Sequence, residues 1–148
     1  MCPHFGLIDG KNLSADEMVL MRAKLHWRGG RRRLRENKTA AGIASIYDAL
    51  LSGMRWYIMV DQNVKPDDYS AEALENERYV FHLLQKKGVV DHSFDIRQIQ
   101  ELADRAIQGG DIEADQASFV AAIEKFLTRL RVLPCDESTL PPEDPATF

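Results

Sequence analysis

Disulfides, zinc ligands and membrane spans have little basis in this sequence. Its 148 residues include only two cysteines, Cys2 and Cys135, near opposite ends of the chain, which is neither a disulfide framework nor a zinc-ligand spacing. No apolar run approaches the roughly 18 residues of a membrane-spanning helix. The first residues lack a basic region followed by an apolar stretch, so no signal peptide is expected. These absences predict a cytoplasmic protein without contact to a membrane.

The sequence also lacks the common motifs of catalysis and nucleotide binding. It contains no Gly-x-Ser-x-Gly, no Walker-type phosphate loop and no alternation of strands and helices, which argues against hydrolases, phosphate-loop enzymes and dinucleotide-binding folds. Three histidines, His4, His26 and His92, have no histidine or cysteine at ligand spacing. We therefore expect no metal and no cofactor.

A helical domain is what the remaining pattern indicates. The chain has the length of one domain, and 45% of its residues are hydrophobic while 28% are charged, which disfavours wholesale disorder. Apolar residues recur at three- and four-residue steps, and no segment reads as a strand. The sequence predicts an all-α, up-and-down antiparallel bundle of about five helices over residues 1–133. The acidic, proline-rich residues 134–148 are predicted to be a disordered tail.

Caps and periodicity place the five helices. Ser14 and Glu17 match a capping box and predict a first helix over about residues 15–36, in which Gly29 and Gly30 allow a break. The segment 39–60 shows the clearest helical period and is predicted to be the central helix. A third helix is expected over 70–87, with Gly88 suited to its left-handed C-cap. A fourth is expected from a cap at Ser93 or Asp95, with Ile107 in its apolar stripe, and a fifth from about Asp115.

Charge is distributed unevenly along the chain. Residues 1–60 hold 10 lysines and arginines against 5 acidic residues, whereas residues 61–148 hold 9 against 18. On a helical wheel, five basic residues of the first helix fall within one arc. Such a ridge is suited to phosphate groups or to an acidic partner, but it is equally the pattern of a solvated face whose arginines pair with the acidic C-terminal half. The ridge comprises Lys24, Arg28, Arg31, Arg32 and Arg35.

Two further groups of residues are candidates for function. Arg78 and His82 are four residues apart on the third predicted helix, where a histidine near its ordinary pKa can move protons in phosphodiester cleavage; an exposed basic flank is the alternative. Met18, Met21 and Leu25 project from the first helix away from its main apolar stripe. They predict a contact in a homodimer, or a contact with an N-terminal arm containing Phe5 and Leu7.

Part of the sequence resembles a known helical family. The similarity covers residues 15–60 and rests on Arg22-Ala23-Lys24, Leu34, Lys38 to Ile43, and Tyr47 to Met54. These resemble the paired helices of HEPN domains (higher eukaryotes and prokaryotes nucleotide-binding). The resemblance implies an antiparallel bundle, frequent dimerisation, and a role as a ribonuclease or as a non-catalytic partner of nucleotidyltransferases.

The catalytic motif of that family is not matched here. Active members carry an arginine, four to six intervening residues and a histidine, whereas Arg78 and His82 are separated by three. The resemblance therefore carries over the fold and the interaction role. We expect a non-enzymatic interaction module, associated with a protein partner, a second copy, or a nucleotide- or RNA-handling protein. The alternatives are a ribonuclease or toxin-type enzyme using Arg78 and His82, and a structural subunit that binds an acidic protein.

Overall fold

Five α-helices make up the domain. The computed structural model describes residues 13–62, 64–65, 69–90 and 93–147. The helices are α1 (Ala15–Arg35), α2 (Thr39–Val60), α3 (Glu77–Lys86), α4 (Ile96–Ile107) and α5 (Glu113–Arg129). Short 3-10 turns are η4 (Ala73–Glu75), η5 (Glu137–Thr139) and η6 (Pro145–Thr147). Because the described ranges hold these five helices and no strand, the predicted all-α class is confirmed.

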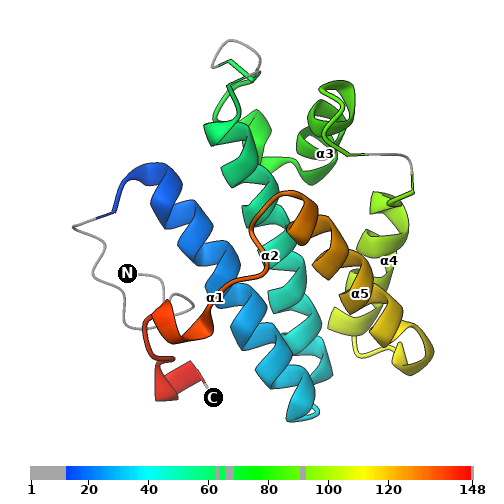
Figure 1. Cartoon of the computed structure of the whole chain (residues 1–148). Helices are drawn as coiled ribbons and strands as arrows, with labels where there is room; N and C mark the ends of the chain where they lie inside the picture. Colours follow the sequence, from blue (N-terminus) through cyan, green and yellow to red (C-terminus); the bar gives the residue numbers. More distant parts are fainter. Residues whose placement is uncertain (1–12, 63, 66–68, 91–92, 148) are drawn as a thin grey trace.

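Helices α1 and α2 form a long antiparallel pair (Figure 1). The serine of the predicted capping box begins α1, since Ser14 Oγ accepts a hydrogen bond from the Glu17 amide at 3.4 Å. The helix then runs without a break through Gly29 and Gly30. A Cβ atom on Gly30 would lie 3.0 Å from the Gly42 carbonyl oxygen of α2. The lack of side chains at Gly30 and Gly42 lets the two backbones approach closely.

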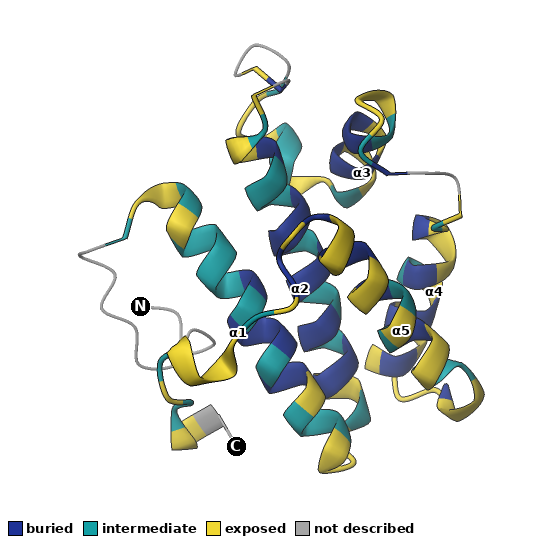
Figure 2. Ribbon diagram, in the orientation of Figure 1, coloured by how far each residue is buried: buried dark blue, intermediate teal, exposed yellow. Residues whose placement is uncertain are grey.

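Helix α2 is the central element, as its sequence predicts. It contacts α1, α3, α4 and α5, and its middle turns are largely buried (Figure 2). Gly53 faces α5, where an added Cβ would lie 2.5 Å from Leu127 Cδ2. Burial of apolar side chains on two sides of one helix supplies much of the hydrophobic stabilisation of the bundle. The fully buried side chains of α2 are Ile43, Ile46, Ala49, Leu50, Met54 and Ile58.

The third helix is shorter than predicted. Residues 73–75 form the separate turn η4, and α3 begins only at Glu77. The Asn76 side chain caps it by accepting a hydrogen bond from the Tyr79 amide at 3.0 Å. Asparagine is favoured at this position because the first backbone amides of a helix have no carbonyl partner within the helix, and the asparagine side chain accepts a hydrogen bond from one of them. The helix ends at Lys86, one residue before the predicted end, and Gly88 has the predicted left-handed backbone with a φ of +74°.

The last two helices differ from prediction only in detail. Asp95 is the N-cap of α4, as expected, and its carboxylate accepts hydrogen bonds from two amides. Ile107 belongs to the predicted apolar stripe but is the last residue of α4 and is 51% exposed. Helix α5 begins at Glu113, two residues before the predicted start. Phe126 of α5 packs against Phe94 at a centroid distance of 4.6 Å.

The C-terminal segment lies against α1, in contrast to the predicted disordered tail. After α5 the chain turns back across α1, as Figure 1 shows. Leu140 is 9% exposed and forms a second apolar cluster with Leu25 of α1. The sequence pattern treats the segment as isolated, whereas here an apolar side chain finds a site on another element. In the described parts of the chain, no helix combines the length and the apolar character needed to cross a membrane.

Candidate functional site

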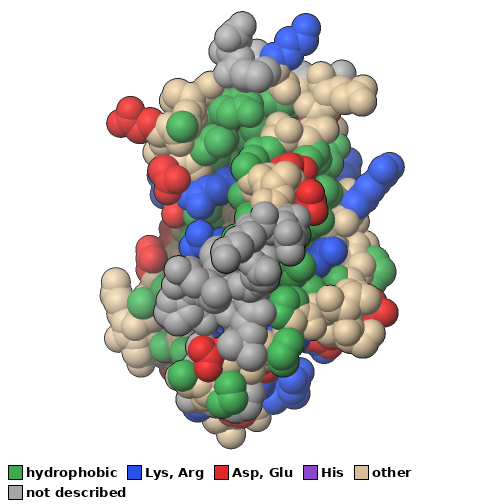
Figure 3. All heavy atoms as spheres, turned by 90° about the vertical axis from the view of Figure 1, so that its left-hand side faces the viewer, with side chains coloured by type: hydrophobic (Ala, Val, Ile, Leu, Met, Phe, Trp, Pro, Cys, Tyr) green, Lys and Arg blue, Asp and Glu red, His purple; other side chains and the backbone are tan. Residues whose placement is uncertain are grey.

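The predicted basic ridge lies along one side of α1, but its members are not equally accessible. Arg31 and Arg35 are exposed, and Lys24 is half-buried. The side chains of Arg28 and Arg32 are only 14% and 12% exposed. Figure 3 shows the side of the molecule that carries α1 and the C-terminal segment, where basic side chains lie among hydrophobic and acidic ones. Two arginines of the ridge are therefore covered, and two face solvent.

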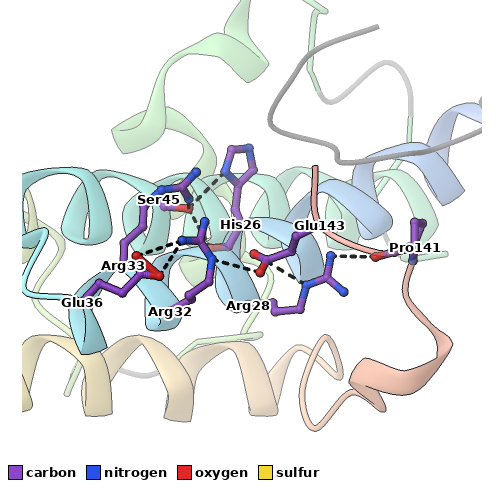
Figure 4. A network of polar contacts seen from close by, with 8 residues as sticks. All are labelled: His26, Arg28, Arg32, Arg33, Glu36, Ser45, Pro141 and Glu143. Atoms are coloured by element: carbon purple, nitrogen blue, oxygen red, sulfur yellow. Dashed lines mark hydrogen bonds and ion pairs between the residues drawn. The ribbon is translucent and has the colours of Figure 1, made fainter. Parts of the chain in front are cut away.

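The C-terminal segment covers the two shielded arginines (Figure 4). Arg28 Nη2 donates a hydrogen bond to the Pro141 carbonyl oxygen at 2.7 Å. Arg32 Nε donates to Glu143 Oε2 at 2.9 Å, and Arg28 Nε lies 3.9 Å from Glu143 Oε1. One carboxylate thus faces two guanidinium groups. The sequence left two interpretations of the ridge open. For Arg28 and Arg32 the structure contains the second one, in which the arginines pair with the acidic C-terminal half of the chain.

Arg32 lies between two carboxylates. Its Nη1 also donates to Glu36 Oε1 at 2.9 Å, one turn further along α1. Burial alone lowers the pKa of Arg32, but the hydrogen bonds to Glu36 and Glu143 outweigh it, and the net effect raises the pKa. The hydrogen bond from Arg32 likewise lowers the pKa of Glu36. Both partners are stabilised in their charged forms, so Arg32 is held by the chain's own carboxylates on both sides.

An apolar socket adjoins the two arginines. Leu140 packs on Leu25, and four further residues surround them. Of the predicted oligomer contacts, Leu25 is thus covered by the chain's own C-terminal segment, and the homodimer stays a prediction. The expected alternative cover, the arm with Phe5 and Leu7, lies outside the described residues. The surrounding side chains are those of Leu13, Met18, Met21 and Cys135.

A cavity of about 170 Å³ lies between α1, α5 and the C-terminal segment. The guanidinium group of Arg31 lies 5.9 Å from the centroid of the Trp27 ring at its wall, which is a cation–π distance. Trp27 itself is 3% exposed, so its ring is not open to a stacking base. Cys135 is a free, half-buried thiol on the same wall, and burial raises its pKa.

A buried serine and histidine contact each other at the α1–α2 interface. Ser45 Oγ donates to the His26 carbonyl oxygen at 2.8 Å and lies 3.4 Å from His26 Nδ1. His26 is 3% exposed and Ser45 is 6% exposed. The hydroxyl proton is directed at a backbone carbonyl and no substrate can reach it, so the pair joins two helices and is not a nucleophile with its base. Arg33 Nη1 approaches Ser45 Oγ at 3.5 Å, and burial lowers the pKa of Arg33.

Arg78 and His82 belong to different surroundings. Arg78 Nε donates to Gln100 Oε1 at 2.9 Å, and Gln100 in turn donates to the Tyr47 hydroxyl at 3.1 Å. These three hydrogen-bonded residues line a polar cavity of about 410 Å³. His82 is not among the residues that line it. His82 Nδ1 lies 3.2 Å from Gln85 Oε1 on the outer side of α3. In the described part of the chain, the side chains of Arg78 and His82 therefore do not line a common cavity.

The sequence predicted the arginines of this site but missed what occupies it. Nothing in the local pattern marks Leu140, Pro141 or Glu143, although the acidic excess of the C-terminal half was a signal for such pairing. Within the described ranges, no group of three or more histidine, cysteine, aspartate or glutamate side chains lies close enough to hold a metal ion. Cys2 lies outside those ranges.

Comparisons with known proteins give no assignment. The sequence matches no protein-family model, and neither curated proteins nor solved structures gave a match. The site must therefore be interpreted from its own chemistry.

Proposed function

We propose that this protein is a non-enzymatic helical interaction module that binds an acidic segment of a partner protein along α1. The observation that carries the proposal is the contact of Arg28 and Arg32 with Pro141 and Glu143 of the chain's own C-terminal segment. A surface that holds a carboxylate and a backbone carbonyl in this way is complementary to an acidic polypeptide.

Two features favour a polypeptide over RNA as the ligand of this surface. The socket around Leu25 is apolar, which suits a hydrophobic side chain and offers nothing to a phosphate. Binding of single-stranded RNA also uses exposed aromatic rings on which bases stack, whereas Trp27 of α1 is buried. The exposed Arg31 and Arg35 extend the basic surface beyond the two covered arginines.

The resemblance to HEPN domains supports the same role from the sequence. That family includes non-catalytic partners of nucleotidyltransferases, so the partner we propose is a nucleotide- or RNA-handling protein of the cytoplasm with an acidic segment. The ribonuclease alternative requires Arg78 and His82 to act on one phosphodiester. Incubation of the purified protein with RNA, beside His82→Ala, tests that alternative: cleavage that is lost on substitution would favour the enzyme over the interaction module.

Binding of acidic probes tests the proposed function. We expect labelled poly-L-glutamate to bind the full-length protein at low salt, and the double substitution Arg31→Gln with Arg35→Gln to weaken binding at least fivefold. Both side chains are exposed, so their loss should leave the fold intact. Substitution of Lys86 and Arg97, exposed residues of α3 and α4, by glutamine removes the same charge and is the matched control.

The outcomes of this experiment separate the alternatives. Equal loss of binding in the control variant would mean that only net charge matters, and the α1 site would be rejected. Retention of a single-stranded RNA, with no retention of poly-L-glutamate, would replace the acidic protein by a phosphate ligand. Either ligand should be lost between low and moderate salt, because both depend on ion pairing.

A further inference from the structure

We propose that Leu140–Glu143 is an internal ligand that occupies the partner site, and that the partner displaces it with the same chemistry: an apolar side chain followed, three residues later in an extended backbone, by a carboxylate. This inference rests on the proposed function and specifies its ligand. It follows from three contacts that one short segment makes with one face of α1.

The three contacts lie at successive turns of α1. Leu140 meets Leu25 in the apolar socket, the Pro141 carbonyl meets Arg28, and the Glu143 carboxylate meets Arg32. Positions 25, 28 and 32 are spaced by three and four residues and therefore share one face of a helix. The face presents an apolar site, a donor for a backbone carbonyl and a site for a carboxylate, in that order.

The length of the segment matches the length of this face. Seven residues of an α-helix, from 25 to 32, rise about 10 Å at about 1.5 Å each. Three residues of extended chain, from 140 to 143, span about 10 Å at about 3.3 Å each. Leu140 has φ −84° and ψ 151°, an extended conformation, and the two prolines that follow favour a polyproline-like backbone. The spacing of the carboxylate from the apolar residue is thus set by the helix.

The contacts of the segment are few enough to exchange with a partner. Among the described residues after Leu133, only Leu140 has less than a tenth of its surface exposed. The arginines and Glu143 retain between 12% and 21% side-chain exposure, so water and salt weaken their attraction. A partner that carries the same groups and additional contacts would therefore displace the internal segment. Intramolecular occupation makes the site weak toward ligands that supply only one of the groups.

Peptide binding to the full-length chain tests the inference. The probe is a labelled peptide with the sequence of residues 136–148, which contains both key side chains. We expect it to bind Glu143→Gln protein at least tenfold more tightly than the wild type, because the internal competitor is weakened. Leu140→Ala with Glu143→Gln should bind it more tightly still. Glu137→Gln, which alters an exposed acidic residue of the same segment, is the control and should bind as the wild type does.

Changes in the peptide test the spacing. Replacement of its glutamate at the position of Glu143 by glutamine, or insertion of one glycine before that residue, should weaken binding to the Glu143→Gln protein at least tenfold. Arg32→Gln in the same protein should do likewise. Because Glu143 is at the surface, Glu143→Gln should remain folded, which circular dichroism checks; hydrogen exchange of residues 137–147 should be faster in that variant than in the wild type.

The results distinguish this inference from the function on which it rests. If the peptide binds wild-type and Glu143→Gln proteins equally, or tolerates the inserted glycine, the internal-ligand inference is overturned while acidic binding stands. If poly-L-glutamate binds but the peptide binds none of the variants, the inference is again overturned. If no acidic probe binds any variant, the proposed function itself fails.

Discussion

The adjacent residues Gly29 and Gly30 of α1 differ in the space available for a side chain. A Cβ on Gly29 would lie 2.8 Å from Arg33 Nη1, the end of a flexible side chain. A Cβ on Gly30 would lie 2.8 Å from Ile46 and 3.0 Å from the Gly42 carbonyl oxygen of α2. Ile46 is fully buried and the carbonyl is backbone, so neither can move easily. Only Gly30 is required by the packing of α1 on α2.

The two positions should respond to alanine in opposite directions. Alanine favours a helix by up to about 1 kcal/mol over glycine, so Gly29→Ala should raise the free energy of unfolding. Gly30→Ala should lower it by about 1–3 kcal/mol, because overpacking outweighs the helix preference. Urea denaturation of both variants measures the difference. If Gly30→Ala raised the free energy of unfolding as much as Gly29→Ala, the close approach of α1 and α2 at Gly30 would not be needed.

At the scale of elements, the C-terminal segment is the feature that changes the character of α1. It brings Glu143 onto a basic helix and shields Leu25, which would otherwise be an exposed apolar residue. The same segment carries Cys135, whose half-buried thiol packs against the cluster of Leu25 and Leu140. Docking of this segment therefore has a chemical reporter in the reactivity of that thiol.

The pH dependence of Cys135 alkylation should report whether the segment is docked. Burial is the largest influence and raises the pKa of the thiol, while nearby Lys24 lowers it by less. The thiolate is the reactive form, so in a Cys2→Ser protein the alkylation rate should rise at a higher pH than for a solvent-exposed cysteine. Leu140→Ala should release the segment and move that rise back to lower pH. The rate of iodoacetamide reaction, followed by mass spectrometry, provides the measurement.

If the alkylation rate of Cys135 had the same pH dependence with and without Leu140→Ala, docking of the segment through Leu140 would be contradicted. Addition of urea to the Leu140-containing protein is the control, since unfolding should return the thiol to the ordinary range of cysteine pKa values.

At the scale of the whole molecule, the apolar core is built around α2. Its apolar residues pack against four other helices, and Leu50 in its middle has no exposed surface. Ile107, which the apolar pattern of α4 groups with core residues, is instead half-exposed. The contribution of an apolar residue therefore depends on its place in the bundle and not on its place in the pattern.

Truncation of these two residues should separate core from surface. Leu50→Ala should lower the free energy of unfolding by about 2–5 kcal/mol, because it leaves a cavity among side chains that cannot collapse fully. Ile107→Ala should lower it by less than about 1 kcal/mol. Thermal or urea unfolding followed by circular dichroism measures both. A loss at Ile107 as large as that at Leu50 would be evidence of a contact that covers the end of α4.

Local chemistry in the sequence was sufficient to predict five helices, although not the start of α3, because caps and apolar periodicity act between residues a few positions apart. The cap at Ser14, the span of α2 and the left-handed Gly88 are all of this kind. The contacts that define the candidate site are not: Arg28 and Pro141 are 113 residues apart, and Arg32 and Glu143 are 111 apart. No local pattern encodes such pairs. The sequence thus determined that α1 carries a row of arginines, and only the tertiary structure decided which of them face solvent and which hold the C-terminal carboxylate.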